Sequence, residues 1–169
     1  MAVIENVMDA IKTAIQMEKD GYAFYKRAAS QTKSDMGRSL FESLSQDERQ
    51  HLNVFEKMFQ QKVDKVDWDA LVNTRKKYVD IPIFPKDLSA IEGSDPDINE
   101  LDALHIAMDS EKEAIEYYNK IRESITDNDT KDILTEIIEQ EKNHYQLLEE
   151  EFNYLSKTGY WYQLDILGG

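Results

Sequence analysis

The sequence contains no cysteine among its 169 residues. Disulfide bonds, zinc–thiolate sites, iron–sulfur clusters and thiol catalysis are therefore excluded. Positive charge is also scarce, since 20 lysine and arginine residues face 34 aspartate and glutamate residues and leave a formal net charge of −14. Such a surface repels nucleic acids and anionic membranes, so we expect neither as a partner.

Long hydrophobic runs are absent as well. The longest stretch without a charged residue, 158–164, has seven residues, whereas a membrane-spanning helix needs about 20 mostly apolar residues. The first residues show no basic segment followed by an apolar stretch, so no secretory signal is visible. We therefore expect a cytoplasmic protein that is not embedded in a membrane.

Glycine and proline are few, with six and three residues, and Pro82 and Pro85 lie close together. Helical periodicity on both sides of them predicts an all-α fold of four long amphipathic helices. Pro96 suits the first position of the third helix. A long connection, 61–96, with a short helix near 68–78, joins two helical hairpins. The expected helices cover 3–31, 35–60, 97–124 and 129–157.

The two hairpins align with each other at a constant offset of 93 residues without a gap. This duplication and the long crossover predict a four-helix bundle of ferritin-like connectivity, residues 1–157, with a pseudo-twofold axis. The remaining residues, 158–169, form an aromatic tail that we expect to pack on the bundle or on a partner subunit. Identical pairs include Glu18/Glu111, Tyr25/Tyr118, Glu48/Glu141 and His51/His144.

Polar residues interrupt the apolar stripe of each helix. The stripe of the second helix runs from Phe41 to Met58, that of the third from Leu101 through Met108 and Ile115 to Tyr118, and that of the fourth from Leu134 to Leu155. A glutamate stands in the first and third stripes at matching depth, and the pattern Glu-x-x-His stands in the second and fourth. Residues three positions apart lie on one helix face and reach a common point. The core-facing polar residues are Glu18, Glu48, His51, Glu111, Glu141 and His144.

Four buried, unpaired carboxylates would each cost roughly several kcal/mol, which a domain of about 5–15 kcal/mol net stability does not tolerate. No lysine or arginine lies at these core-facing positions. Two divalent cations would balance the charge, with the imidazoles as neutral ligands, and mixed oxygen and nitrogen ligation suits iron or manganese. The alternative is a remnant of duplication in which these residues are ordinary surface positions.

This constellation resembles the ferritin-like di-iron carboxylate superfamily and, within it, rubrerythrin-like proteins without a rubredoxin domain. The resemblance covers essentially the whole chain. It implies that Glu18 and His51 favour one metal ion, that Glu111 and His144 favour the other, and that two glutamates, Glu48 and Glu141, bridge both. It implies two iron ions as cofactor, with manganese or a mixed pair as alternatives, and a homodimer or higher homo-oligomer.

The sequence departs from rubrerythrin in two ways. Rubrerythrin has an additional glutamate three residues after the ligand of the third helix, where this chain has Ala114, and the mirror position is Gly21. These small residues either leave room for a small substrate or allow close helix packing. Without cysteine there is no rubredoxin domain, so reducing electrons must come from an external donor protein or from Fe²⁺ itself.

Further residues near the expected site have two interpretations each. Asp47 and its counterpart Gln140 either accept hydrogen bonds from His144 and His51 across the axis or are solvated. The tyrosines of the ligand face either bond to the ligands or, as we favour, only pack in the core; they are Tyr22, Tyr25 and Tyr118. His105 points about 120° away from the ligand face, so we expect it not to bind metal.

The resemblance implies a non-haem di-iron oxidoreductase that reduces hydrogen peroxide or O2. In this reading the four carboxylates take part in catalysis as well as in metal binding, because they hold the charge of the product. The alternatives are a ferroxidase or iron-storage protein that oxidises Fe²⁺, and a protein whose metal ions only stabilise the fold. The four expected catalytic carboxylates are Glu18, Glu48, Glu111 and Glu141.

Overall fold

The computed structural model describes residues 7–62 and 96–161 of the chain. These residues form four long α-helices and no strand. The expected short helix near 68–78 and most of the expected crossover and tail lie outside the described residues. The helices are α1 (Val7–Gln31), α2 (Asp35–Lys62), α4 (Pro96–Ser124) and α5 (Asn128–Thr158).

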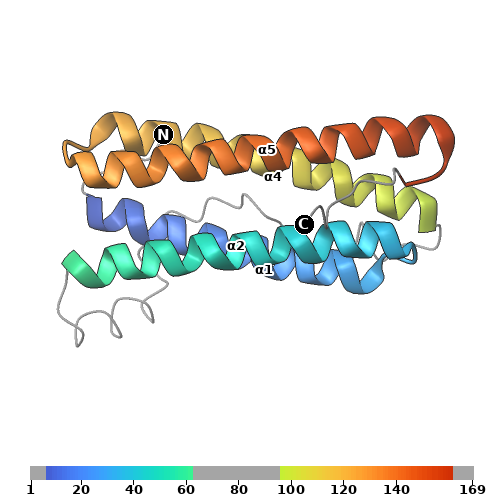
Figure 1. Ribbon diagram of the computed structural model, residues 1–169, viewed down its shortest axis with the longest axis horizontal. Coiled ribbons are helices and arrows are strands. Elements are labelled where there is room, and N and C mark those ends of the chain that lie inside the picture. The colour runs from blue at the N-terminus through green and yellow to red at the C-terminus, as the bar shows by residue number, and fades with distance from the viewer. Residues whose placement is uncertain (1–6, 63–95, 162–169) are drawn as a thin grey trace, which may run out of the picture.

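The helices run side by side as two hairpins that form an all-α bundle (Figure 1). Helix α1 packs along α2 and α4 packs along α5, while smaller contacts join α1 to α4 and α2 to α5. Short loops, 32–34 and 125–127, connect the helices of each hairpin. The predicted all-α bundle is thus confirmed, and helix ends agree with the predicted ones within about two residues wherever the structure describes them.

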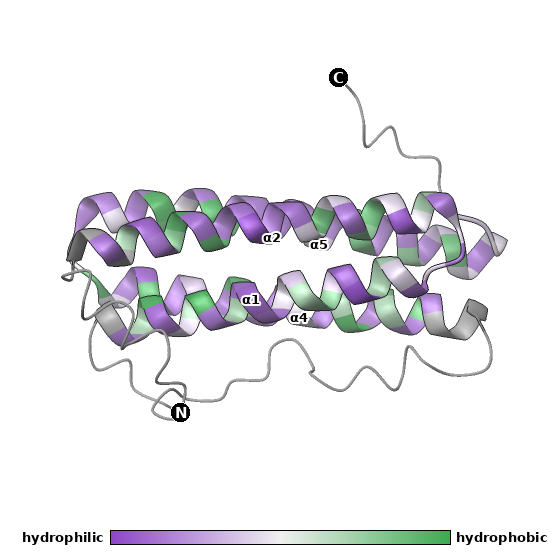
Figure 2. Cartoon of the chain, turned by 90° about the horizontal axis from the view of Figure 1, so that it is seen from below, coloured by the Kyte–Doolittle hydropathy of each residue, from purple (hydrophilic) through white to green (hydrophobic). Residues whose placement is uncertain are grey.

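Each helix carries both hydrophobic and hydrophilic residues along its length (Figure 2). The predicted apolar stripes of α2 and α5 are buried throughout, from Phe41 to Met58 and from Leu134 to Leu155. One continuous hydrophobic core lies between the helices. The polar interruptions of the stripes therefore lie inside the bundle.

The buried face of α4 is rotated relative to the predicted one. Leu101, Met108 and Ile115, which the pattern placed in the stripe, are only half-buried. Leu104 and Tyr118 of the stripe are completely buried, and alanines on the adjoining side of the helix, Ala103 and Ala107, are buried with them. Small side chains let helices approach closely, so they can lie nearest the axis although they contribute little to an apolar pattern.

The ends of the bundle are closed by specific contacts. Asp127 caps α5 by accepting a hydrogen bond from the backbone N–H of Thr130, and Gly159 ends that helix in the left-handed conformation at φ 75°. Beyond this point Trp161 packs edge-on against Phe41 and donates a hydrogen bond of 3.0 Å from Nε1 to Glu100 Oε2. Trp161 therefore links the end of α5 to the first turns of α2 and α4.

None of the described helices is long and apolar enough to cross a membrane.

Candidate metal centre

The six polar residues that interrupt the stripes lie together near the middle of the four helices. Those of the α1–α2 hairpin face those of the α4–α5 hairpin. All six are buried, with at most 5% of any of them exposed. Each helix contributes at the position that the duplication predicts, so the two hairpins present equivalent side chains to each other. They are Glu18 on α1, Glu48 and His51 on α2, Glu111 on α4, and Glu141 and His144 on α5.

The side chains form two overlapping groups, each with one ligand atom per residue and all atoms within 4.8 Å of one another. The first group combines Glu18 and His51, and the second combines Glu111 and His144. Both groups also contain Glu48 and Glu141. This sharing is the geometry that two metal ions with two bridging carboxylates require.

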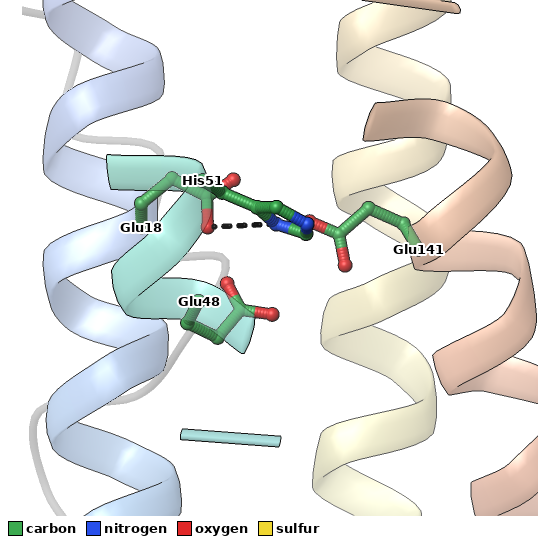
Figure 3. Close-up of side chains that lie close together, drawn as sticks. All are labelled: Glu18, Glu48, His51 and Glu141. Atoms are coloured by element: carbon green, nitrogen blue, oxygen red, sulfur yellow. Dashed lines mark ion pairs between the residues drawn. The ribbon is translucent and has the colours of Figure 1, made fainter. Parts of the chain in front are cut away.

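Figure 3 shows how the first group is built. His51 extends from α2 between Glu18 on α1 and Glu141 on α5, and Glu48 lies one turn before it. Its Nδ1 is 3.5 Å from Glu18 Oε2 and 3.2 Å from Glu141 Oε1. One imidazole nitrogen of α2 thus faces carboxylates from both hairpins.

The second histidine is oriented in the same way. His144 Nδ1 lies 3.4 Å from Glu48 Oε1, 3.5 Å from Glu111 Oε1 and 3.0 Å from Glu141 Oε2. The two imidazole rings are stacked with their centroids 5.8 Å apart. Both Nδ1 atoms therefore point at the carboxylates, so Nδ1 is the nitrogen of each ring that could bind a metal ion placed among them.

The other nitrogen of each ring has a partner from the opposite hairpin. His51 Nε2 lies 2.6 Å from Gln140 Oε1, and His144 Nε2 lies 3.0 Å from Asp47 Oδ2. An oxygen acceptor at Nε2 holds a proton there, so Nδ1 is the nitrogen that can give up its proton and offer a lone pair to a cation. Of the two interpretations of Asp47 and Gln140, the structure has the one with hydrogen bonds across the axis.

Two tyrosines hold carboxylates of the opposite hairpin. Tyr25 donates a hydrogen bond of 2.5 Å to Glu111 Oε1, and Tyr118 donates one of 2.5 Å to Glu18 Oε1. Both tyrosines are completely buried. The favoured interpretation of these residues as core packing alone was wrong. The signal that could have corrected it was the recurrence of both tyrosines across the duplication at a fixed distance from a ligand.

The pKa values of three of the carboxylates are strongly shifted. Burial, with Glu141 and Glu18 nearby, raises the pKa of Glu48 well above its usual range. Burial also raises the pKa of Glu111 to about 8, although His144 opposes this effect. Burial alone would raise the pKa of Glu141 too, but the nearby imidazoles of His144 and His51 bring it well below its usual range.

Both histidines respond to the surrounding negative charge. Burial would lower the pKa of His51, but Glu18 and Glu141 raise it to about 11. Burial likewise opposes protonation of His144, yet its contacts with Asp47 and Glu111 raise the pKa well above the usual range. Protons thus balance the carboxylates when no cation is bound, and cations would displace those protons on binding.

Four buried polar atoms in the centre have no hydrogen-bond partner, namely Glu18 Oε2, Glu48 Oε1, His51 Nδ1 and Glu111 Oε2. Buried polar atoms without a partner are rare because each costs about 1–3 kcal/mol. Three are carboxylate oxygens and one is an imidazole nitrogen, all of which bind divalent transition metals. The donor set therefore fits a pair of such ions.

The other residues considered in the sequence lie outside this cluster. His105 is exposed and pairs with Asp109 on the surface, with 3.4 Å between Nε2 and Oδ2. Tyr22 is half-buried and has the Lys26 ammonium 5.4 Å from its ring centroid. Gly21 and Ala114 are both buried, which both interpretations of these small residues require.

Comparison with known proteins agrees with this architecture. The model of the rubrerythrin family matches residues 9–152. No curated protein matches the chain. The solved structure of a hypothetical protein from Pyrococcus furiosus is similar, with 21% identity, a TM-score of 0.68, and coverage of 90% of this chain and 92% of that one. At this identity the solved structure supports the fold alone, whereas the family match spans most of the chain. The chain belongs to the rubrerythrin family.

Proposed function

We propose that the centre binds two iron ions and that the protein reduces hydrogen peroxide or O2 with electrons from them. The observation that supports this proposal is the sharing of Glu48 and Glu141 by two otherwise separate ligand groups. A single structural metal ion would need only one of these groups. Two ions joined by carboxylates can instead deliver two electrons to one small oxidant.

When bound, two ferrous ions supply the two electrons that, with two protons, convert one molecule of hydrogen peroxide into two of water. In this proposal Glu18 and His51 hold one ion, and Glu111 and His144 hold the other. Manganese or a mixed pair would fit the same donors.

The remaining residues keep the ligands in place. Tyr118 and Tyr25 each fix one carboxylate oxygen, so that the second oxygen of Glu18 and of Glu111 stays directed into the centre. Asp47 and Gln140 fix the tautomer of the histidines. Burial of all six side chains excludes bulk water, so the geometry does not depend on solvent.

The chain has no cysteine and hence no iron–sulfur site of its own. Return of electrons to the centre would therefore require an external donor protein. We propose the chain as one component of a two-component peroxide-reducing system, in a homodimer or larger homo-oligomer.

The test is the iron content per chain after anaerobic loading with Fe²⁺, followed by mixing with peroxide or with O2. We expect about two irons per chain and faster oxidation by one of the two oxidants. The double variant His51→Ala/His144→Ala should lose the iron, whereas His105→Ala, which changes an exposed histidine, should keep it. Many irons per chain would support iron storage instead, and two irons that resist both oxidants would contradict a redox role.

A further inference from the structure

The two hairpins differ at the residues that accept hydrogen bonds from the two histidines. His144 has the carboxylate of Asp47 at its Nε2, whereas His51 has the amide oxygen of Gln140 at the same place. Asp47 and Gln140 occupy equivalent positions in the two hairpins. One imidazole is therefore supported by a charged acceptor and the other by a neutral one.

The two halves offer the same types of ligand, although His144 Nδ1 faces three carboxylates and His51 Nδ1 faces two. Each half has an equivalent glutamate and histidine, each shares Glu48 and Glu141, and each glutamate accepts a hydrogen bond of 2.5 Å from a buried tyrosine. The difference in charge between Asp47 and Gln140 thus acts on two halves with the same ligand types. Its effect can be isolated by substitution.

A charged acceptor changes the ligand through the shared proton. A carboxylate at Nε2 draws the ring proton more strongly than an amide does, so more electron density remains on Nδ1 and the imidazole becomes a better donor. The negative charge of Asp47 also attracts a cation at the same half of the centre. The stronger donor and the added negative charge both increase the affinity of the Glu111/His144 position for a cation.

We infer that the two metal positions are unequal and that the Glu111/His144 position fills first, because Asp47 supports His144. Asp47 is a positioning residue that acts through the imidazole and does not bind the metal itself. The inference rests on the proposed metal centre, but it concerns the order of binding rather than the reaction. Since outer partners of a ligating histidine change metal affinity about 10–100-fold, we expect the two positions to differ by about tenfold or more.

The order can be observed with Zn²⁺, a redox-inert probe, and protein labelled with ¹⁵N in histidine. The full chain has three histidines, so a His105→Gln background leaves only the two of the centre in the spectrum. The Nδ1 resonance of each ring shifts on coordination. We expect the His144 resonance to complete most of its shift with the first equivalent of Zn²⁺ and the His51 resonance to complete most of its shift with the second.

Two substitutions of unchanged size move the charge from one half to the other. Asp47→Asn removes it from His144, and Gln140→Glu adds one at His51. Both positions lie at the rim of the cluster, where Asp47 is 42% exposed and Gln140 is exposed, so the core is not altered. We expect Asp47→Asn to make both resonances shift together, and the double variant to make His51 bind first.

An unchanged order in the double variant would overturn the inference, as would simultaneous filling in the unsubstituted chain. Two bound Zn²⁺ ions without any order would leave the proposed centre intact, so the two failures can be told apart. No binding at all, in a protein whose circular dichroism remains helical, would overturn the centre together with the inference.

Discussion

At the scale of single residues, the Glu-x-x-His pattern indicates a metal centre only because it occurs twice at equivalent positions. A lone glutamate three positions before a histidine is common. Here the copies lie 93 residues apart, each on a buried stripe, with Glu18 and Glu111 at the same offset. The pattern of residues alone therefore predicts that all six side chains meet. It does not predict the hydrogen bonds of the tyrosines, because a buried phenol at helical spacing fits the core equally well.

The bridging carboxylates can be tested by stoichiometry. Glu48→Gln or Glu141→Gln should lower the affinity for both ions, because each residue contributes to both ligand groups. Glu18→Gln is the matched control, since it belongs to one group and should weaken one ion only. Metal content after loading with a small excess of Fe²⁺ measures the difference. Full retention of one ion in Glu48→Gln would contradict a bridging role.

The phenol of Tyr118 can be tested by stability. Tyr118→Phe keeps the ring in place but leaves Glu18 Oε1 without its donor inside the bundle. Hydrogen bonds to charged groups contribute about 1.5–3 kcal/mol, so the free energy of unfolding in urea should fall by about that amount. Tyr25→Phe removes the equivalent donor to Glu111, whose pKa of about 8 leaves it mostly neutral near pH 7, so we expect a smaller loss of about 0.5–1.5 kcal/mol there. A loss below about 0.5 kcal/mol in both variants would show that the phenols contribute packing alone.

At the scale of elements, periodicity predicted four helices but misjudged which face of α4 is most buried. The pattern gave weight to large apolar residues such as Leu101 and Met108, which are half-buried. Small residues such as Ala103 and Ala107 are buried in their place. A hydrophobic pattern measures apolar surface, whereas the distance between helices depends on side-chain size, so this rotation could not be predicted from the pattern.

The first turn of α2 provides a test of close packing. A Cβ added at Gly37 would lie 2.6 Å from Thr32 Cγ2 and 2.6 Å from Trp161 Cε2. Helix propensity alone predicts that Gly37→Ala stabilises the protein by up to about 1 kcal/mol. We expect destabilisation instead, because the indole must move and its hydrogen bond to Glu100 weakens.

Trp161 fluorescence measures this displacement. The chain has two tryptophans, so a Trp68→Phe background leaves Trp161 as the single indole. Its emission should shift to longer wavelength in Gly37→Ala, while Ser39→Ala, an exposed change on the same helix, should leave it unchanged. If Gly37→Ala were more stable and the emission of Trp161 stayed at its original wavelength, the indole would not have moved. This result would contradict the expected clash at Gly37.

At the scale of the whole molecule, the centre concentrates four carboxylates and two imidazoles in the middle of the bundle. The unfolded chain does not hold these groups together, so ions that bind the folded state stabilise it by mass action. At a free concentration about 100 times the Kd, one ion contributes about 2.7 kcal/mol. We expect the midpoint of thermal unfolding to rise with anaerobic Fe²⁺ and to return to its starting value with a chelator.

The control for this prediction is the double variant His51→Ala/His144→Ala, whose midpoint should not respond to Fe²⁺. An equal rise in this variant would assign the stabilisation to ions bound at the acidic surface, which the net charge of −14 also attracts.

The bonds of the centre have a consequence for the origin of the chain. Tyr25 holds Glu111, Tyr118 holds Glu18, and each histidine is supported from the opposite hairpin. Each ligand group likewise takes one carboxylate from the other half. A single hairpin therefore carries half a centre, and its own copy carries the complement. If the chain arose from one hairpin by duplication, two copies of that hairpin would have completed the centre by self-association, and joining them in one chain would have allowed positions 47 and 140 to differ.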